Sequence, residues 1–234
     1  MNIHILSLLP GARQACGVAV IVDVYRAFTS ASVAFRQGAR RIIMVDRPEQ
    51  ALALRDQGAG ELCLGEVDGI QVPGFDYGNS PWELSEVELT GKTLIQSTGA
   101  GTRGVVAAAG AEAVFAAALV NAEATAAAIT ALEAERVSIV AMGSRAEMRG
   151  EEDELCALYL RNRLQGFRPD RSALRTLLRA SCDSAKFEDP QLPHFDPRDR
   201  DIALQVDTIP IAIRVRKEGA LRVAEPLTTG TSKP

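Results

Sequence analysis

The loop from Gly74 to Pro81 gathers more polar chemistry than any other short stretch of the chain. It reads Gly-Phe-Asp-Tyr-Gly-Asn-Ser-Pro and brings a carboxylate, an amide and a hydroxyl together with two glycines. Glycine lets the backbone come close to a ligand, while Asn and Asp form turns and present side-chain oxygens. This loop is therefore the first candidate for a functional site.

A second candidate is Asp23-Val24-Tyr25-Arg26, which ends an apolar run that is typical of a buried strand. In one interpretation Asp23 is a metal ligand or a base, and the guanidinium of Arg26 binds an anion. In the other, Asp23 caps the helix that follows and Arg26 is solvated in its first turn. Taken alone, the capping interpretation is favoured because helix caps are commoner than ligands.

Further carboxylates follow two other predicted strands. Glu66 stands directly after Gly65 and is equally consistent with a cation ligand or a solvated loop residue. Ser144 and Arg145 follow the last strand of the alternating region and precede the four acids of 151–154. Acids at a helix start usually complement the helix dipole. One of them could instead point back over the strand ends and complete a carboxylate cage.

The segment Gly99-Ala100-Gly101-Thr102-Arg103-Gly104 lies between a predicted strand and a predicted helix. It matches the G-x-G-x-x-G pattern of dinucleotide-binding loops, and Glu123 lies downstream. The helix that follows is short, and Thr102 and Arg103 at its start favour a compact phosphate or sulfonate. Anion binding at a helix N-terminus is thus favoured over dinucleotide binding, with a simple glycine turn as the remaining alternative.

Strand-like and helix-like segments alternate along the chain and would position these residues. Such alternation predicts a three-layer α/β/α fold with a largely parallel, mixed sheet, in which ligands bind beyond the carboxyl ends of the strands. We expect one domain over residues 1–234, with an irregular segment at 182–201. The predicted strands are 3–8, 18–23, 41–45, 61–65, 93–98, 113–120, 137–142, 209–215 and 220–223, and the predicted helices are 26–37, 48–57, 101–109, 122–133, 151–164 and 171–180.

Composition excludes several classes of function. The formal net charge of −4 argues against a general nucleic-acid surface, and no apolar run is long enough to span a membrane. The four cysteines are scattered without zinc-like spacing, which indicates reduced thiols in a cytoplasmic protein. With only two histidines, any metal is expected to be a hard cation held by carboxylates. A homodimer is compatible with these numbers.

Taken together, these segments resemble the 2-phosphosulfolactate phosphatase family. The resemblance runs from about residue 18 to about residue 160, and the Phe-Asp-x-Gly-Asn-Ser-Pro part of the first loop is its most specific piece. The other matching pieces are Asp23-Val24-Tyr25-Arg26-Ala27, Leu64-Gly65-Glu66, Gly91-Lys92-Thr93-Leu94, Gly101-Thr102-Arg103, and Gly143-Ser144-Arg145 with Glu152-Asp153.

The resemblance implies a Mg²⁺-dependent phosphatase that releases phosphate from 2-phosphosulfolactate and gives sulfolactate, a step toward coenzyme M. Three positions depart from the family pattern. Val67 stands where an arginine is usual, Ala100 where an asparagine is usual, and Lys186-Phe187 where a His-Gly pair is expected. These departures put the family substrate in more doubt than the metal and the phosphatase chemistry.

Hydrolysis of a phosphate monoester needs charge neutralisation, a proton for the leaving group and an aligned nucleophile. Our hypothesis places carboxylates around Mg²⁺ and basic or hydroxyl side chains around a small acidic phosphate ester. The predicted metal ligands are Asp23, Glu66 and Asp76 with Glu152 or Asp153; the catalytic residues are Asp23, Asp76 and Arg26; and the substrate-binding residues are Asn79, Ser80, Thr102, Arg103, Ser144 and Arg145.

Three alternatives remain open at this point. The chain could hydrolyse another small acidic phosphate ester, or it could be a catalytically silent anion-binding protein on the same fold. It could also be a nicotinamide-dependent enzyme that uses the loop 99–104. No nucleic acid or membrane partner is expected in any of them.

Overall fold

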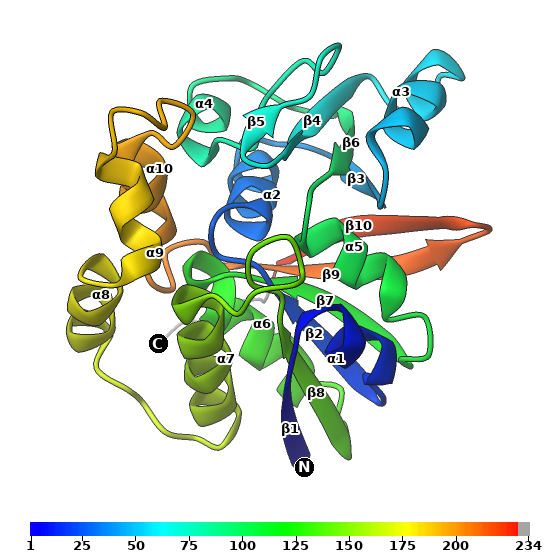
Figure 1. Cartoon of the computed structure of the whole chain (residues 1–234). Helices are drawn as coiled ribbons and strands as arrows, with labels where there is room; N and C mark the ends of the chain where they lie inside the picture. The colour runs from blue at the N-terminus through cyan, green and yellow to red at the C-terminus, as the bar shows by residue number, and fades with distance from the viewer. Residues whose placement is uncertain (229–234) are drawn as a thin grey trace.

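The computed structural model describes residues 1–228 and contains one mixed sheet with helices packed on both faces (Figure 1). This arrangement confirms the predicted α/β/α fold class. The strands are β1 (Asn2–Ser7), β2 (Val18–Val22), β3 (Arg41–Val45), β4 (Leu62–Val67), β5 (Ile70–Gln71), β6 (Thr93–Ser97), β7 (Ala113–Ala117), β8 (Arg136–Ala141), β9 (Ile211–Glu218) and β10 (Leu221–Thr228).

The helices connect these strands and cover the sheet. They are α1 (Leu8–Gln14), α2 (Ala27–Arg36), α3 (Pro48–Asp56), α4 (Pro81–Ser85), α5 (Gly101–Ala107), α6 (Ala122–Thr130), α7 (Glu151–Leu164), α8 (Arg171–Arg179), α9 (Cys182–Ala185) and α10 (Pro197–Ala203), with two short 3₁₀ turns, η1 (Leu119–Asn121) and η2 (Lys186–Glu188).

The sheet consists of two parallel blocks joined by one hairpin. Its strand order is β1-β8-β2-β7-β9-β10-β3-β6-β4-β5. Strands β1, β8, β2 and β7 run parallel to one another, and so do β3, β6 and β4. The antiparallel hairpin β9–β10 pairs with β7 on one side and with β3 on the other (Figure 1).

The strands of the parallel blocks are apolar because both of their faces are covered. All five residues of β2, Val-Ala-Val-Ile-Val, are buried, as expected for a parallel strand between two helical layers. The main core packs these strands against α2, α5 and α6. A smaller core between α3 and the opposite face of β3 contains Ile43, Val45 and Phe75.

Helix α5 brings the two blocks together and depends on glycine to do so. It packs against β2 and β7 of one block and against β3 and β6 of the other. A Cβ on Gly101 would lie 2.8 Å from Asp23 Oδ2, and one on Gly104 would lie 2.4 Å from Met142 Sδ. Side chains at these positions would push α5 away from the end of β2.

The predicted boundaries agree with the structure for most strands and for α2, α3, α7 and α8, within a few residues. The prediction that 182–201 is irregular is wrong in part, because α9, η2 and the first turns of α10 lie within it. Helices α1 and α4 were not predicted at all. Helix α4 begins with Ser80, whose Oγ accepts a hydrogen bond from the N–H of Glu83, followed by Pro81 in its first turn.

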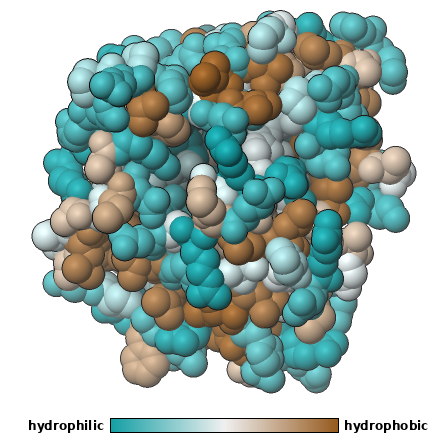
Figure 2. Space-filling view, in the orientation of Figure 1, coloured by the Kyte–Doolittle hydropathy of each residue, from teal (hydrophilic) through white to brown (hydrophobic). Residues whose placement is uncertain are grey.

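The four cysteines form no disulfide in the structure, as expected for reduced thiols. Within residues 1–228, no helix combines the length and the apolar character that crossing a bilayer requires. On the face shown in Figure 2, hydrophilic residues are interspersed with smaller hydrophobic patches.

Candidate active site

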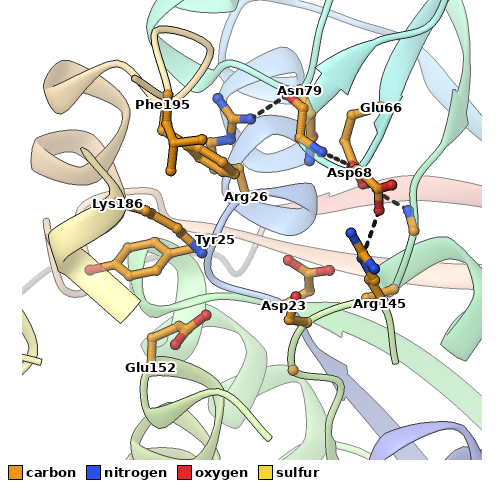
Figure 3. A pocket seen from close by; sticks show the side chains of 16 residues that line it. Asp23, Tyr25, Arg26, Glu66, Asp68, Asn79, Arg145, Glu152, Lys186 and Phe195 are labelled. Atoms are coloured by element: carbon orange, nitrogen blue, oxygen red, sulfur yellow. Dashed lines mark hydrogen bonds and ion pairs between the residues drawn. The ribbon is translucent and has the colours of Figure 1, made fainter. Parts of the chain in front are cut away.

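A cleft of about 280 Å³ opens beyond the carboxyl ends of β2 and β8 from one block and of β4 and β6 from the other. Its walls also include side chains from the segment that follows α9 (Figure 3). The lining residues are Asp23, Tyr25, Arg26, Glu66, Asp68, Gly69, Asn79, Gly99, Ala100, Gly143, Ser144, Arg145, Glu152, Lys186, Leu192 and Phe195.

Asp23 is buried at the floor of the cleft, immediately after β2. Its Oδ1 accepts a hydrogen bond from the backbone N–H of Ala27 at 3.0 Å, so this carboxylate caps the start of α2 while it faces the cleft. Burial and, after it, the negative charge of Glu66 raise the pKa of Asp23 to about 6. The capping interpretation is confirmed, and a role as metal ligand or base stays a prediction.

Glu66 ends β4 and holds two turns in place across the cleft from Asp23. Its Oε1 accepts the backbone N–H of Gly99 at 2.7 Å, and its Oε2 accepts that of Gly69 at 2.6 Å. Glu66 thus places two carboxylate oxygens at the cleft, and each of them keeps lone pairs for a further partner.

Glu152 and Asp153 are neighbours on α7 but have different surroundings. Glu152 lines the cleft, and its buried Oε2 has no hydrogen-bond partner within residues 1–228. Burial, with the nearby Asp153, raises the pKa of Glu152 well above its usual range. Asp153 lies behind the cleft wall, where its two oxygens accept the N–H groups of Val24 and Gly143. It positions the loops after β2 and β8.

The loop from Gly74 to Pro81 contributes only Asn79 to the cleft. The Oδ1 of Asn79 is buried without a hydrogen-bond partner in the described part of the chain. Asp76 is exposed and lies outside the cleft; its Oδ2 accepts the N–H of Cys63 at 2.8 Å and pairs with Arg55 at 3.3 Å. Our hypothesis required Asp76 to lie beside Asp23 and Glu66, and the structure does not bring it there.

Ser80 likewise has a role within the fold. Its Oγ caps α4 and donates a 2.6 Å hydrogen bond to Asp199 Oδ1. It is not among the cleft-lining residues, so the structure places it beside the site rather than in it.

Arg26 lines the cleft, but its guanidinium is engaged by the protein. It is buried and forms a 2.7 Å ion pair with Asp199, which is fully buried. It also donates to the backbone carbonyls of His194 and Gly69 at 2.8 and 3.0 Å. Instead of binding an anion with its guanidinium, Arg26 holds the segment before α10 against the turn after β4.

Arg145 and Ser144 follow β8 and are exposed at the cleft rim. The guanidinium of Arg145 pairs at 2.7 Å with Asp68, across the cleft mouth (Figure 3). Both residues of this pair are more than half exposed, so the pair itself adds little stability.

The loop 99–104 does not present a free set of N–H groups. The hydroxyls of Thr98 and Thr102 accept each other's backbone N–H, and Gly99 donates to Glu66. Arg103 donates to the carbonyl oxygens of Gly99 and Arg145. Thr102 and Arg103 therefore stiffen the turn and do not line the cleft. With α5 only seven residues long, a dinucleotide site has no support here.

Sequence reasoning missed the cleft residues that come from the C-terminal third. Lys186, Leu192 and Phe195 all lie in the segment predicted to be irregular. Of the three departures from the family pattern, Val67 is exposed outside the cleft, whereas Ala100 and Lys186 line it. No local periodicity marks this segment as functional, and the one signal in it was that Lys186-Phe187 stands where the family has a His-Gly pair.

The carboxylates do not form the cage that we predicted from Asp23, Glu66 and Asp76 with Glu152 or Asp153, because Asp76 and Asp153 do not line the cleft. Within residues 1–228, no three Asp, Glu, His or Cys side chains converge tightly enough to hold a metal alone. Mg²⁺, however, is often bound by one or two carboxylates, with waters and substrate phosphate completing the shell. Asp23 fits that type, because its buried charge is disfavoured and Glu66 adds a second negative charge nearby.

Comparison with known proteins connects this cleft to one family. The family model for 2-phosphosulpholactate phosphatase matches residues 3–189. The probable 2-phosphosulfolactate phosphatase of Bacillus subtilis is 30% identical over 207 residues, which cover 88% of this chain and 90% of that protein. The proteins of the same name from Deinococcus radiodurans and Thermus thermophilus are 39% and 36% identical; the matches cover 59% and 64% of this chain and 58% and 62% of theirs.

Proposed function

This chain belongs to the 2-phosphosulfolactate phosphatase family, and we propose that it hydrolyses 2-phosphosulfolactate to sulfolactate and phosphate with the help of Mg²⁺. The observation that carries this proposal is the convergence of Asp23, Glu66 and Glu152 on one cleft at the strand ends, with Asn79 and a lysine facing them. Carboxylates beside cationic and amide groups suit a metal-assisted phosphoryl site.

In this proposal Asp23 and Glu66 would hold Mg²⁺. When bound, the cation would neutralise charge on the phosphoryl oxygens and help to align the attacking water. Asp23 is kept in place by its bond to the Ala27 N–H, and Glu66 by its bonds to Gly69 and Gly99. Neither carboxylate has to reorganise to receive the substrate, which is the property that electrostatic catalysis requires.

Glu152 is suited to supply the proton that the departing alkoxide needs. Burial raises its pKa well above the usual range, which favours the protonated form, and its Oε2 is not committed to another group among residues 1–228. Asn79 can donate from its side-chain amide to a phosphoryl oxygen, since its orientation in the cleft is held by burial.

We further propose that the reaction takes place in the cytoplasm and that sulfolactate serves coenzyme M synthesis in organisms that make it. These parts rest on the sequence and on the family resemblance.

The test is release of phosphate from 2-phosphosulfolactate, followed with and without Mg²⁺ and EDTA. We expect Glu152→Gln to lower kcat by about 100-fold or more, as removal of a general acid does. Glu151→Gln is the matched control, because Glu151 precedes it on α7 but is exposed and lies outside the cleft. Equal activity in the two variants would remove Glu152 from the mechanism.

Metal binding is tested separately from turnover. Mg²⁺ should raise the unfolding temperature of the wild-type protein, since a ligand that binds the folded state stabilises it. Asp23→Asn should abolish that shift. A wild-type protein that gains no stability from Mg²⁺ and loses no activity in EDTA would overturn the metal assignment.

A further inference from the structure

Lys186 presents an ammonium group to the cleft from an aromatic surrounding (Figure 3). Its Nζ lies 5.1 Å from the ring centre of Phe195, 5.4 Å from that of Tyr25 and 5.6 Å from that of Phe187. At such distances aromatic rings attract a cation and restrict where it can go. The lysine head group is therefore held near one place rather than swinging freely.

The backbone that carries Lys186 is also fixed. Phe187, the next residue, is buried and makes edge-to-face contacts with Tyr25 at 5.0 Å and with Phe195 at 5.5 Å. The hydroxyl of Tyr25 shares a 2.8 Å hydrogen bond with that of Ser184, two residues before Lys186. A binding group held by packing on both sides is preorganised, which reduces the entropy lost on binding.

Lys186 differs from the other two cations of the cleft in having no acidic partner among residues 1–228. Arg26 is paired with Asp199, and Arg145 with Asp68. With these two neutralised, Asp23, Glu66 and Glu152 face the cleft as acids or potential acids. An anionic ligand must overcome that charge, and Lys186 is the side chain available to attract it.

We infer that Lys186 is a specificity residue that binds a second acidic group of the substrate, a carboxylate or a sulfonate, rather than the phosphate that is cleaved. This inference rests on the proposed function. The phosphate belongs beside Asp23 and Glu66, where Mg²⁺ and Asn79 can contact its oxygens. Lys186 lies among aromatic rings and Leu192. This part of the cleft offers one ammonium group and few other hydrogen-bond donors. That surrounding suits a single acidic group better than a phosphoryl group, which needs several contacts.

A structural role for Lys186 makes different predictions. If the ammonium served only to pack on the rings or to offset the charge of Glu152, its loss would lower stability or change kcat for every substrate alike. If it binds a second acidic group, its loss would matter only for substrates that carry one. The comparison between substrates separates the two roles.

The experiment measures kcat and KM for three phosphate monoesters: 2-phosphosulfolactate, 2-phospholactate, which lacks the sulfonate, and isopropyl phosphate, which has no second acid. Lys186→Met keeps the stem against the rings and removes the charge. We expect it to raise KM about 10- to 100-fold for the esters whose acid it binds, the range of a charge-assisted hydrogen bond. Values for isopropyl phosphate should stay within about threefold of wild type.

The substrates identify which acid is bound. A rise in KM confined to 2-phosphosulfolactate would assign Lys186 to the sulfonate. A rise in KM for both acidic esters would assign it to the carboxylate. Lys186→Arg should retain most of the affinity, and Lys217→Met, on the exposed end of β9, should change nothing. Equal loss for all three esters would overturn the inference.

Failure of the proposed function would show differently, as no turnover of any ester by the wild-type protein. Thermal stabilisation by sulfolactate then tests Lys186 without catalysis. The inference requires this stabilisation in wild type and its loss in Lys186→Met, and its persistence in the variant would overturn it.

Discussion

Two regions that contribute to the cleft differ in how much of their chemistry reaches it. The loop 74–81 is rich in motif-like polar residues, yet Asp76 and Ser80 are hydrogen-bonded within the fold and only Asn79 lines the cleft. The segment 182–200 has no comparable motif, yet it supplies Lys186, Leu192 and Phe195. A motif-like polar sequence can thus determine the conformation of a loop, while the binding groups come from a segment nearer the C-terminus.

The two regions are physically linked through Asp199. Its Oδ2 pairs with Arg26, and its Oδ1 accepts hydrogen bonds from Ser80 Oγ and from the Trp82 N–H. One buried carboxylate therefore fastens the C-terminal segment to the motif loop and to the end of β2. This linkage allows each region to be tested against the other.

The largest effect is expected from Asp199→Ala. Removal of this side chain leaves the guanidinium of Arg26 buried without its charge partner, which typically costs about 3–5 kcal/mol of folding free energy. Chemical denaturation measures the loss. A cost below about 1 kcal/mol would show that the C-terminal segment is held by its aromatic contacts instead.

Asp23→Asn should have the opposite effect on stability while it abolishes activity. The folded-state pKa of Asp23 is about 6 against an ordinary 3.8, so the folded protein retains a proton that the unfolded chain releases. Stability attributable to this group is thus full below about pH 4 and falls as the pH rises to about 6. At pH 7 the variant should be more stable by about 3 kcal/mol, and at pH 4 by much less.

Denaturation of wild type and Asp23→Asn at the two pH values, both without metal, measures this difference. If the variant were more stable than wild type by the same amount at both pH values, burial of the Asp23 charge would not be the source of the difference.

Ser80→Ala should cost about 1–2 kcal/mol, because it removes the cap of α4 and one hydrogen bond to Asp199. The substitution tests whether the Ser80 hydroxyl stabilises the fold rather than binding the substrate. Thermal unfolding should show the loss, while KM for 2-phosphosulfolactate should change less than about threefold. A large rise in KM with unchanged stability would instead restore Ser80 as a substrate contact.

Asp76→Asn is expected to have the smallest effect. Asp76 is exposed, and an amide oxygen can still accept the Cys63 N–H, so stability should change by less than about 1 kcal/mol. Activity should stay within about twofold of wild type. A loss of 100-fold would reverse the comparison between the two regions and return Asp76 to the catalytic groups.

Much of the site was predictable because parallel strands end at one edge of a sheet. Asp23, Glu66 and Ser144, which follow strands, line one cleft as that rule predicts, and Glu152 at the start of α7 lines it too. The rule could not reveal which side chains already have partners within the protein. Arg26 pairs with a residue far away in the sequence, and Thr102 is hydrogen-bonded to a residue of its own turn. Nor could it place Lys186, whose position depends on packing between Phe187, Tyr25 and Phe195.

Two missed helices did carry a readable signal. Ser80-Pro81 begins α4 and Asp196-Pro197 begins α10, each a capping side chain followed by proline in the first turn. Helix α1 is different, because Pro10 and Gly11 lie inside it and argue against a helix.

The place of the hairpin β9–β10 in the sheet has a consequence for how the protein is made. Translation proceeds from the N-terminus, so β9 and β10 emerge from the ribosome after every other strand among residues 1–228. Yet, within residues 1–228, these two strands lie at the centre of the sheet and provide the only hydrogen-bonded connection between the blocks that carry the cleft walls. A nascent chain that has reached residue 205 has every proposed catalytic side chain but no continuous sheet on which to align them. The two walls of the cleft can therefore be aligned only after β9 and β10 have been synthesised.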